Sequence, residues 1–330
     1  MLTDQHGGTQ TAPEPKLVSV VIPAYNEAAG IEGTLEEVGS TLQSLGLPYE
    51  IIIVDDGSDD ATFAIVNRLN LSDSRLRGLR FSRRFGKEAA LLAGLESARG
   101  DVVVTMDADL QHPPALIPVM LERWRAGAMV VHGVKHKREH DGVVVRKLSD
   151  LFNTVFSMSG GFDMRNGSDF KLLGRTAVDV VVRKLPERRR FYRGLAAWVG
   201  FTQDSVPFDV DARASGGGKW SLAGLLELAT TAIISFTSAP LRIVTILGAV
   251  TLVFGIILAA DTVWSWFEGQ AVSGFATIII TLLLLGSFIM ISLGIIGEYI
   301  AKIYDEIKER PAYLVESRCG FESGGDRAGE

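Results

Sequence analysis

Two aspartates that follow an apolar run have the type and spacing expected of a metal site. Residues 101–112 read DVVVTMDADLQH, in which Val102 to Thr105 favour a buried strand and Asp107 and Asp109 come just after it. Carboxylate oxygens suit Mg²⁺ or Mn²⁺, and such an ion commonly completes its coordination with phosphate oxygens of a substrate. Asp-x-Asp also occurs in turns and on solvated surfaces, so that interpretation stays open beside the metal and phosphate site.

Apolar runs and helical patterns alternate along the first half of the chain. The predicted strands are 17–22, 50–54, 76–81, 102–106 and 129–134, and the predicted helices include 28–45, 86–98 and 113–125. This alternation predicts an α/β fold whose mostly parallel sheet is covered by helices on both faces. Such sheets bind ligands beyond the carboxyl ends of their strands, where the loops 23–27, 55–58 and 107–111 would share one crevice.

The loop 55–58, Asp-Asp-Gly-Ser, has two interpretations. Asp55 and Asp56 suit a turn and a helix cap, which explains one acid well and leaves the second without a role. A pair of carboxylates is also a good hydrogen-bond acceptor for a base edge or ribose hydroxyls.

Composition excludes several classes of protein. The chain has 33 basic and 39 acidic side chains, a net charge of −6, which gives no general affinity for nucleic acid. Its single cysteine, Cys319, excludes an intramolecular disulfide framework and a zinc site built from cysteines. Residues 1–16 lack the apolar core of a signal peptide and are expected to be a disordered leader.

The C-terminal third predicts attachment to a membrane. Residues 221–240 fit an amphipathic interfacial helix, and a hairpin over 241–300 would span the bilayer at about 243–260 and 271–297. Lys and Arg flank the outer ends of the two spans but are absent between them, which places residues 17–220 and a tail, 301–330, in the cytosol at the plasma membrane.

Three cationic segments could meet anionic groups. The stretch 211–220, DARASGGGKW, suits a flap that grips phosphate or a flexible linker, and the basic segment 135–147 suits a phosphate-binding or a solvated loop. The stretch 186–194, PERRRFYRG, has the composition of an interfacial loop that reaches lipid headgroups. His132, His136 and His140 recur every four residues, but Gly133 and the strand-like residues before it disfavour a metal-binding helix.

Several motifs, in order along the chain, resemble those of family 2 inverting glycosyltransferases with the GT-A fold. The first three are residues 20–27 (VVIPAYNE), 53–58 (IVDDGS) and 107–109 (DAD). The segments 81–88, 109–113, 168–173 and 213–220 narrow the resemblance to the polyisoprenyl-phosphate branch, which is like dolichyl-phosphate-mannose synthase, in its bacterial type with two C-terminal transmembrane helices. The similarity covers about residues 17–310.

The resemblance implies roles for individual residues. The nucleotide would be held by Pro23, Tyr25, Glu27, Asp55, Asp56, Lys87 and Asp107; Mg²⁺ or Mn²⁺ by Asp107, Asp109 and Gln111; and the acceptor phosphate by Arg138, Arg146, Arg213 and Lys219. Asp109 and Asp169 would be catalytic, although Asp169 also suits a helix cap. The chain departs from the family pattern at Arg84, usually Asn, and at 218–220, where Gly-Lys-Trp replaces Ser-Lys-Tyr.

The expected function is therefore transfer of a sugar, with inversion, to a polyprenyl phosphate in the bilayer, for glycosylation of the cell envelope. The expected donor is a UDP-sugar such as UDP-glucose, with GDP-mannose as an alternative; undecaprenyl phosphate is the favoured acceptor, and a homo-oligomer is expected. A processive polysaccharide synthase is disfavoured because only two spans are predicted and Gln-x-x-Arg-Trp is absent. A catalytically silent scaffold is disfavoured because Asp107 and Asp109 are intact.

Overall fold

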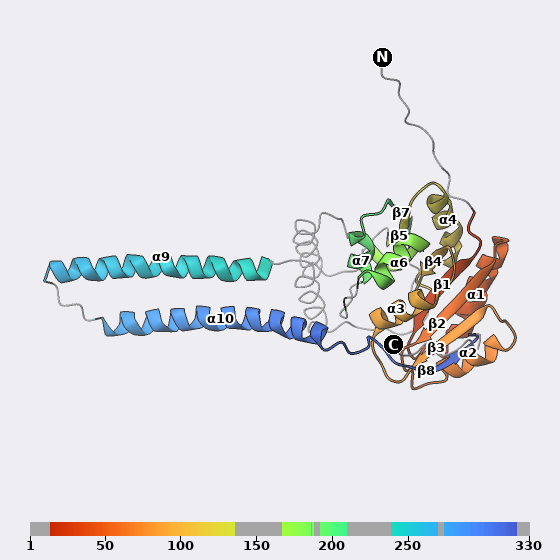
Figure 1. Cartoon of the computed structure of the whole chain (residues 1–330), viewed down its shortest axis with the longest axis horizontal. Helices are drawn as coiled ribbons and strands as arrows, with labels where there is room; N and C mark the ends of the chain where they lie inside the picture. Colours follow the sequence, from red (N-terminus) through yellow and green to blue (C-terminus); the bar gives the residue numbers. More distant parts are fainter. Residues whose placement is uncertain are drawn as a thin grey trace, which may run out of the picture. The chain divides into compact units, whose positions relative to one another are not determined.

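A computed structural model describes residues 14–135, 167–185, 187, 192–209, 239–269 and 274–321, which fall into two compact units. The first unit contains the strands β1 (Val18–Ala24), β2 (Tyr49–Asp55), β3 (Leu76–Phe81), β4 (Val102–Thr105), β5 (Val130–Lys135), β6 (Gly167–Gly174), β7 (Gln203–Phe208) and β8 (Val315–Cys319). Its helices are α1 (Ile31–Ser44), α2 (Thr62–Asn70), α3 (Lys87–Ser97), η1 (Pro114–Leu116, a 3₁₀ turn), α4 (Ile117–Arg125), α6 (Arg175–Arg183) and α7 (Tyr192–Trp198). The second unit contains α9 (Ala239–Phe267) and α10 (Phe275–Ile307) (Figure 1).

All eight strands of the first unit form one sheet, in the order β7-β5-β6-β4-β1-β2-β3-β8. Only β6 and β8 run against the direction of the other described strands. The chain proceeds from β1 through β2 to β3 on one side of the sheet and then places β4 on the other side of β1. This reversal makes the carboxyl ends of β1 and β4 the switch point, at which open α/β sheets bind ligands.

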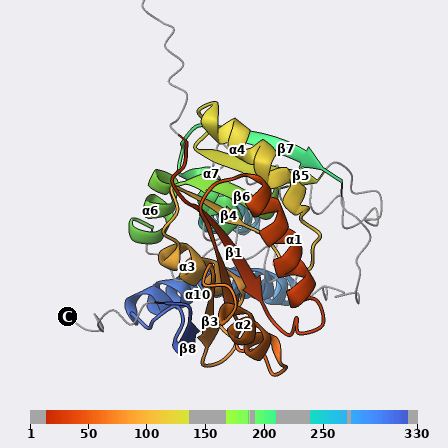
Figure 2. The ribbon, with the colours of Figure 1, turned by 90° about the vertical axis from the view of Figure 1, so that its right-hand side faces the viewer.

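Side chains alternate between the two faces of the sheet, and each face has its own core. Val20 and Ile22 of β1 pack with α1, α2 and α4, whereas Val21 packs with α3, α6 and α7. Figure 2 shows α1 and α3 on opposite sides of β1. Strands buried on both faces read as nearly continuous apolar runs, which is why the sequence predicted them. The expected mostly parallel α/β sheet is confirmed.

Two elements of the first unit differ from the sequence-based expectation. Asp169 lies within strand β6, so the interpretation as a helix cap was wrong. The predicted tail, 301–330, contains β8, which pairs antiparallel with β3 and completes the sheet after the hairpin. The residues of β8, VESRC, are partly polar because it is an edge strand, and its burial alternates along its length.

The second unit consists of two helices long and apolar enough to cross a membrane. The candidate spans are Val244–Ser265, with mean hydropathy 2.2, and Ile280–Tyr304, with mean hydropathy 2.4. Both extend further toward the C-terminus than predicted, since α9 continues through the tryptophan-containing segment assigned to the connection. Pro240 occupies the first turn of α9, where proline is tolerated. Residues 221–238 of the predicted interfacial helix (221–240) lie outside the described residues, as do residues 1–13 of the predicted leader (1–16).

A close contact between α3 and β1 provides a test of this packing. A Cβ atom added at Gly94 would overlap Cγ1 of Val21, whereas one added at Gly33, on the exposed side of α1, would meet nothing within 4 Å. Gly94→Ala should lower the free energy of unfolding by about 1–3 kcal/mol because α3 must move off the sheet. Gly33→Ala should instead raise it by roughly 0.5–1 kcal/mol through helix propensity. Denaturant unfolding in detergent micelles measures both, and equal effects would contradict the packing.

Candidate active site

Hydrogen bonds join the loops that follow β1 and β2. The backbone N–H of Asn26 donates to Oγ of Ser58 at 2.9 Å, and its side-chain Oδ1 accepts the N–H of Asp59 at 2.9 Å. The N–H of Glu27 donates to Oγ1 of Thr62, also at 2.9 Å. Asn26 has a positive φ of 56°, a conformation that asparagine tolerates better than most residues. The loop after β1, which was predicted to contact the nucleotide, is therefore held against the loop after β2.

Asp55 and Asp56 have separate structural tasks. Oδ1 of the fully buried Asp55 accepts the N–H of Ser58 at 2.9 Å and a short hydrogen bond from its hydroxyl, while Oδ2 is buried without a hydrogen-bond partner. Burial raises the pKa of Asp55, against the hydrogen bonds from Ser58. Nε of Arg80 lies 3.9 Å from this Oδ2, which is an ion pair beyond hydrogen-bond distance, so Oδ2 of Asp55 still suits a ligand that donates an N–H or O–H.

The carboxylate of Asp56 holds the loop that leads into α3. It accepts the N–H of Phe85 at 2.7 Å and the N–H of Gly86 at 2.9 and 3.0 Å. Gly57 permits this close approach: its φ is +69°, and an added Cβ would lie 2.6 Å from the carbonyl carbon of Arg83. Asp56 thereby fixes the position from which Lys87 extends.

The Asp107–Asp109 loop is also held at several points. Buried His112 accepts the N–H of Asp107 at Nδ1 over 3.0 Å, and its ring stacks on Phe170 with centroids 5.2 Å apart. The hydroxyl of Thr34 donates to the carbonyl of Ala108 at 2.7 Å. The carboxylate of Asp109 itself stays exposed, and its contact within the loop is the N–H of Gln111 at 3.1 Å.

Three acids face one another across the switch point. Burial raises the pKa of Glu27, and the negative charges of Asp109, Asp60 and Asp107 raise it further. Glu27 follows β1, whereas Asp107 and Asp109 follow β4, so the charges of these two loops are close enough to interact. Negative charges gathered in this way favour a cation.

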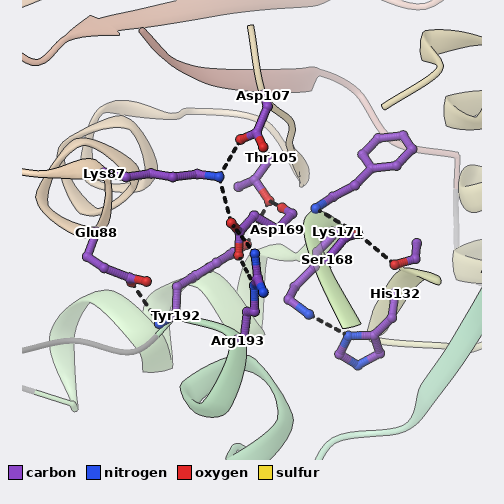
Figure 3. A network of polar contacts seen from close by, with 12 residues as sticks. Lys87, Glu88, Thr105, Asp107, His132, Ser168, Asp169, Lys171, Tyr192 and Arg193 are labelled. Atoms are coloured by element: carbon purple, nitrogen blue, oxygen red, sulfur yellow. Dashed lines mark hydrogen bonds and ion pairs between the residues drawn. The ribbon is translucent and has the colours of Figure 1, made fainter. Parts of the chain in front are cut away.

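A chain of ion pairs extends from this edge of the sheet toward α7 (Figure 3). Nζ of Lys87, the first residue of α3, lies 2.5 Å from Oδ1 of Asp107 and 2.6 Å from Oδ2 of Asp169. Arg193 of α7 donates to the same aspartate twice, from Nε to Oδ1 at 2.6 Å and from Nη2 to Oδ2 at 2.9 Å. Burial by itself would raise the pKa of Asp169, but Arg193 and Lys87 outweigh it and hold that pKa far below its usual range.

Helix α7 is attached to the site through its first residue. The N–H of Tyr192 donates to Oε2 of Glu88 at 2.8 Å, and its hydroxyl lies 3.0 Å from Oγ1 of Thr105. Thr105 in turn donates to the carbonyl of Asp169 at 2.6 Å, so α3, β4, β6 and α7 are joined by one polar network. These bonds place the guanidinium of Arg193 on the carboxylate of Asp169.

A second polar pair lies beside this network (Figure 3). Nζ of the buried Lys171 is 2.8 Å from Nδ1 of His132, whose Nε2 is 2.9 Å from Oε1 of Gln203. Burial lowers the pKa of Lys171 to about 7, and burial together with Lys171 lowers the pKa of His132 to about 4. The geometry fits a neutral imidazole that accepts from Lys171 and donates to Gln203, which leaves His132 no free nitrogen for a metal.

The residues at the switch point fit a divalent ion by their chemistry. Among the described residues, no group of three or more His, Cys, Asp or Glu side chains is arranged to hold a metal. Asp107, Asp109 and Gln111 nevertheless offer the oxygen ligands that Mg²⁺ and Mn²⁺ prefer. One of these ligands, Asp107, is already in contact with the Lys87 ammonium.

Two more of the residues expected near the nucleotide lie at the carboxyl end of β1. Pro23 and Tyr25 are partly buried, and the guanidinium of Arg84 lies over the Tyr25 ring at 4.3 Å from its centroid. The predicted acceptor-phosphate residues, Arg138, Arg146, Arg213 and Lys219, lie outside the described residues, as do His136 and His140.

Arg193 belongs to the site, although the sequence analysis predicted a lipid-binding role for the stretch that contains it. The stretch 186–194 was expected to reach lipid headgroups as a whole, but its Arg193 turns inward to Asp169. The apolar residues that follow it, Leu195 and Ala196, are buried and signal a packed helix. Nothing in the sequence identifies Asp169 as the partner, because the two residues meet only through the tertiary fold.

Glu88 gives the site a testable pH dependence. Burial raises its pKa from 4.5 to about 7, so the folded protein prefers the neutral carboxyl. Its contribution to stability is present below about pH 4.5 and is lost as the pH rises through about 7. Relative to Glu88→Gln, wild-type protein should therefore lose about 1–3 kcal/mol of unfolding free energy between about pH 5 and pH 8. Denaturant unfolding at both pH values measures it; Glu36→Gln, on the exposed face of α1, is the control, and equal curves for Glu88→Gln and wild type would contradict it.

Two protein-family models match separate parts of the chain, one in each of the two structural units. Residues 19–184 match the model of glycosyl transferase family 2, and residues 239–303 match the GtrB C-terminal hairpin. The first match covers the strands β1 to β6, and the second covers α9 and most of α10.

Curated relatives match almost the full length of the chain. A bactoprenol glucosyl transferase of Shigella phage SfX is 36% identical over 306 residues, which are 91% of this chain and 99% of that one. An uncharacterized glycosyltransferase of Synechocystis is 37% identical, with 92% of this chain and 96% of that one covered.

A solved structure is similar at a greater distance. Glucosyl-3-phosphoglycerate synthase from Mycobacterium tuberculosis, in complex with Mn²⁺, UDP and phosphoglyceric acid, shares 23% identity over 66% of this chain and 76% of that one, with a TM-score of 0.44. This similarity says nothing about the ligands of the present chain.

Proposed function

Because the chain belongs to glycosyl transferase family 2 and carries the GtrB C-terminal hairpin, we propose that it transfers glucose from UDP-glucose to a polyprenyl phosphate, most simply undecaprenyl phosphate. The observation that carries this proposal is the near full-length similarity to bactoprenol glucosyl transferases, hairpin included. The structure supports it with an acid-lined switch point and two candidate membrane spans in one chain. Assembly into a homo-oligomer stays a prediction.

On the donor side, each loop offers a different kind of contact. Oδ2 of Asp55 would accept an N–H of the base, and the carboxylate of Glu27 would accept ribose hydroxyls. Tyr25 would pack against the nucleoside, and Lys87 would reach the diphosphate from the N-terminus of α3, where backbone N–H groups also favour an anion. Asp107, Asp109 and Gln111 would hold Mg²⁺ or Mn²⁺, which when bound offsets negative charge on the departing nucleoside diphosphate.

On the acceptor side, Asp169 would help to position the acceptor phosphate rather than remove a proton from it. Its pKa is held far below its usual range by Arg193 and Lys87, so it binds protons too weakly to serve as a base near neutral pH. A phosphate monoester is already ionised there, since its second pKa is about 6, and its oxygen can attack the anomeric carbon without a strong base. The bond to UDP breaks as the new bond forms on the opposite face of the sugar, which would invert the anomeric centre.

The connectivity of the chain supports a hairpin that begins and ends on the side of the catalytic unit. Strand β7 precedes α9 and strand β8 follows α10, yet both belong to the same sheet. Two spans return the chain to the side from which it left, so the sheet can be completed. The cationic residues that flank the outer ends of the hairpin support the cytosol as that side.

The proposed reaction is tested with purified protein in detergent, undecaprenyl phosphate, and a panel of labelled donors that includes UDP-glucose and GDP-mannose. We expect metal-dependent transfer of glucose to the lipid, and roughly a 100-fold or greater loss in Asp109→Asn, because loss of a metal ligand weakens the electrostatic stabilisation of the departing diphosphate. Asp179→Asn, an acid on helix α6, is the matched control and should keep full activity. A polymeric product, or no turnover with any donor, would refute the proposal.

The orientation is tested by labelling with a maleimide that does not cross membranes. Cys319 is the only native cysteine and is buried in β8, so it gives little background. Ser273→Cys, between α9 and α10, should be labelled in intact cells, because the connection would lie outside. Gln43→Cys, on the exposed face of α1, should be labelled only after the cells are opened. Labelling of both variants from the same side would exclude the hairpin.

A further inference from the structure

We propose that Lys87 is an internal counter-ion, which neutralises Asp107 in the absence of ligands and is displaced when a divalent ion and a nucleoside diphosphate bind together. This inference rests on the proposed function, which supplies both ligands. It adds a coupling between them: each ligand should bind more tightly when the other is present.

The contact between Lys87 and Asp107 occupies an oxygen that a metal ion would also need. The ammonium nitrogen of Lys87 lies 2.5 Å from Oδ1 of Asp107. A divalent metal ion on that oxygen would bring two more positive charges next to the ammonium. Ammonium and metal ion therefore compete for Asp107, and the affinity for metal alone is reduced by the work of displacing Lys87.

The surroundings of Lys87 let its side chain move while its backbone stays fixed. The carboxylate of Asp56 holds the N–H groups of Phe85 and Gly86, which fixes the start of α3. The Lys87 side chain is 39% exposed, whereas that of its second partner, Asp169, is 7% exposed and is held twice by Arg193. Loss of the contact to Asp107 therefore leaves the ammonium at the site, attached to Asp169.

A nucleoside diphosphate would supply the displaced ammonium with a new partner. Lysine carries three N–H donors, of which the contacts to Asp107 and Asp169 use two. A diphosphate oxygen that replaces Asp107 restores the lost charge-assisted hydrogen bond. The diphosphate thus offsets the free energy that is lost when a metal ion separates Lys87 from Asp107. By linkage, the metal ion strengthens diphosphate binding by the same factor.

The experiment measures the affinity of the full-length protein in detergent for Mn²⁺, by electron paramagnetic resonance, with and without UDP. In wild type, UDP should strengthen Mn²⁺ binding by about tenfold or more. In Lys87→Met, Mn²⁺ alone should bind about tenfold more tightly than in wild type, and the effect of UDP should fall to roughly threefold or less. Lys87→Arg, which keeps the charge, should bind Mn²⁺ alone as weakly as wild type does.

Arg83→Gln is the matched control for a general loss of positive charge. Arg83 lies on the same loop, and its guanidinium contacts the ring of Phe85 and the carbonyl of Arg84. Its removal should change the affinity for Mn²⁺ alone by less than about threefold. An equal gain in Arg83→Gln and Lys87→Met would overturn the specific role of Lys87.

Two further results would overturn the inference. One is unchanged or weaker Mn²⁺ binding in Lys87→Met, and the other is wild-type protein whose Mn²⁺ affinity does not respond to UDP. Lys87→Gln replaces Lys87→Met if the latter does not fold. Wild type that makes the lipid product but shows no Lys87 effect refutes only this inference, whereas coupled binding of Mn²⁺ and UDP without any lipid product refutes only the proposed function.

Discussion

The burial of one negative charge, that of Asp169, constrains the whole site. An aspartate side chain that is 7% exposed would normally take up a proton, since burial disfavours its charged form. Three N–H groups from Lys87 and Arg193 prevent this, and they come from two helices that are far apart in the sequence. Loss of one partner from such a pair typically costs about 3–5 kcal/mol, because an uncompensated buried charge remains. The N-terminus of α3 and the first turn of α7 are therefore located by electrostatics as much as by packing.

The site combines a closed half with an open one. Asp56 and Asp169 are buried, and their oxygens are used by hydrogen bonds that hold loops and helices in place. Burial and the neighbouring negative charges of Asp109, Asp60 and Asp107, by contrast, raise the pKa of Glu27. Within the described part of the chain, neither Glu27 nor Asp109 forms an ion pair. The closed half gives the site its shape before any ligand arrives, whereas the open half favours the arrival of positive charge. Preorganised polar groups of this kind are the usual means by which enzymes stabilise charge that develops during a reaction.

Much of the fold was predictable because it depends on local patterns. Strands such as β1 and β4, buried on both faces, read as apolar runs, and the loops after them carry the acids. The convergence of Glu27 with Asp107 and Asp109 followed from the parallel sheet alone. The sequence did not reveal the place of Asp169 in β6 or its pairing with Arg193, because both depend on a strand that runs against its neighbours. It likewise did not reveal β8, whose alternating, partly polar residues resemble a tail until β3 is placed beside them.

The position of β8 has a consequence for how the protein forms. It is the last strand in the described part of the chain, and it covers the edge of β3, a strand made more than 200 residues earlier. During synthesis, β3 would therefore keep an open edge until both helices of the hairpin have left the ribosome and the chain has returned to the sheet. Open strand edges invite pairing with other chains, so the time needed for the helices to enter a bilayer is also the time during which the nascent enzyme is exposed to aggregation. Completion of the sheet therefore follows the synthesis of both helices.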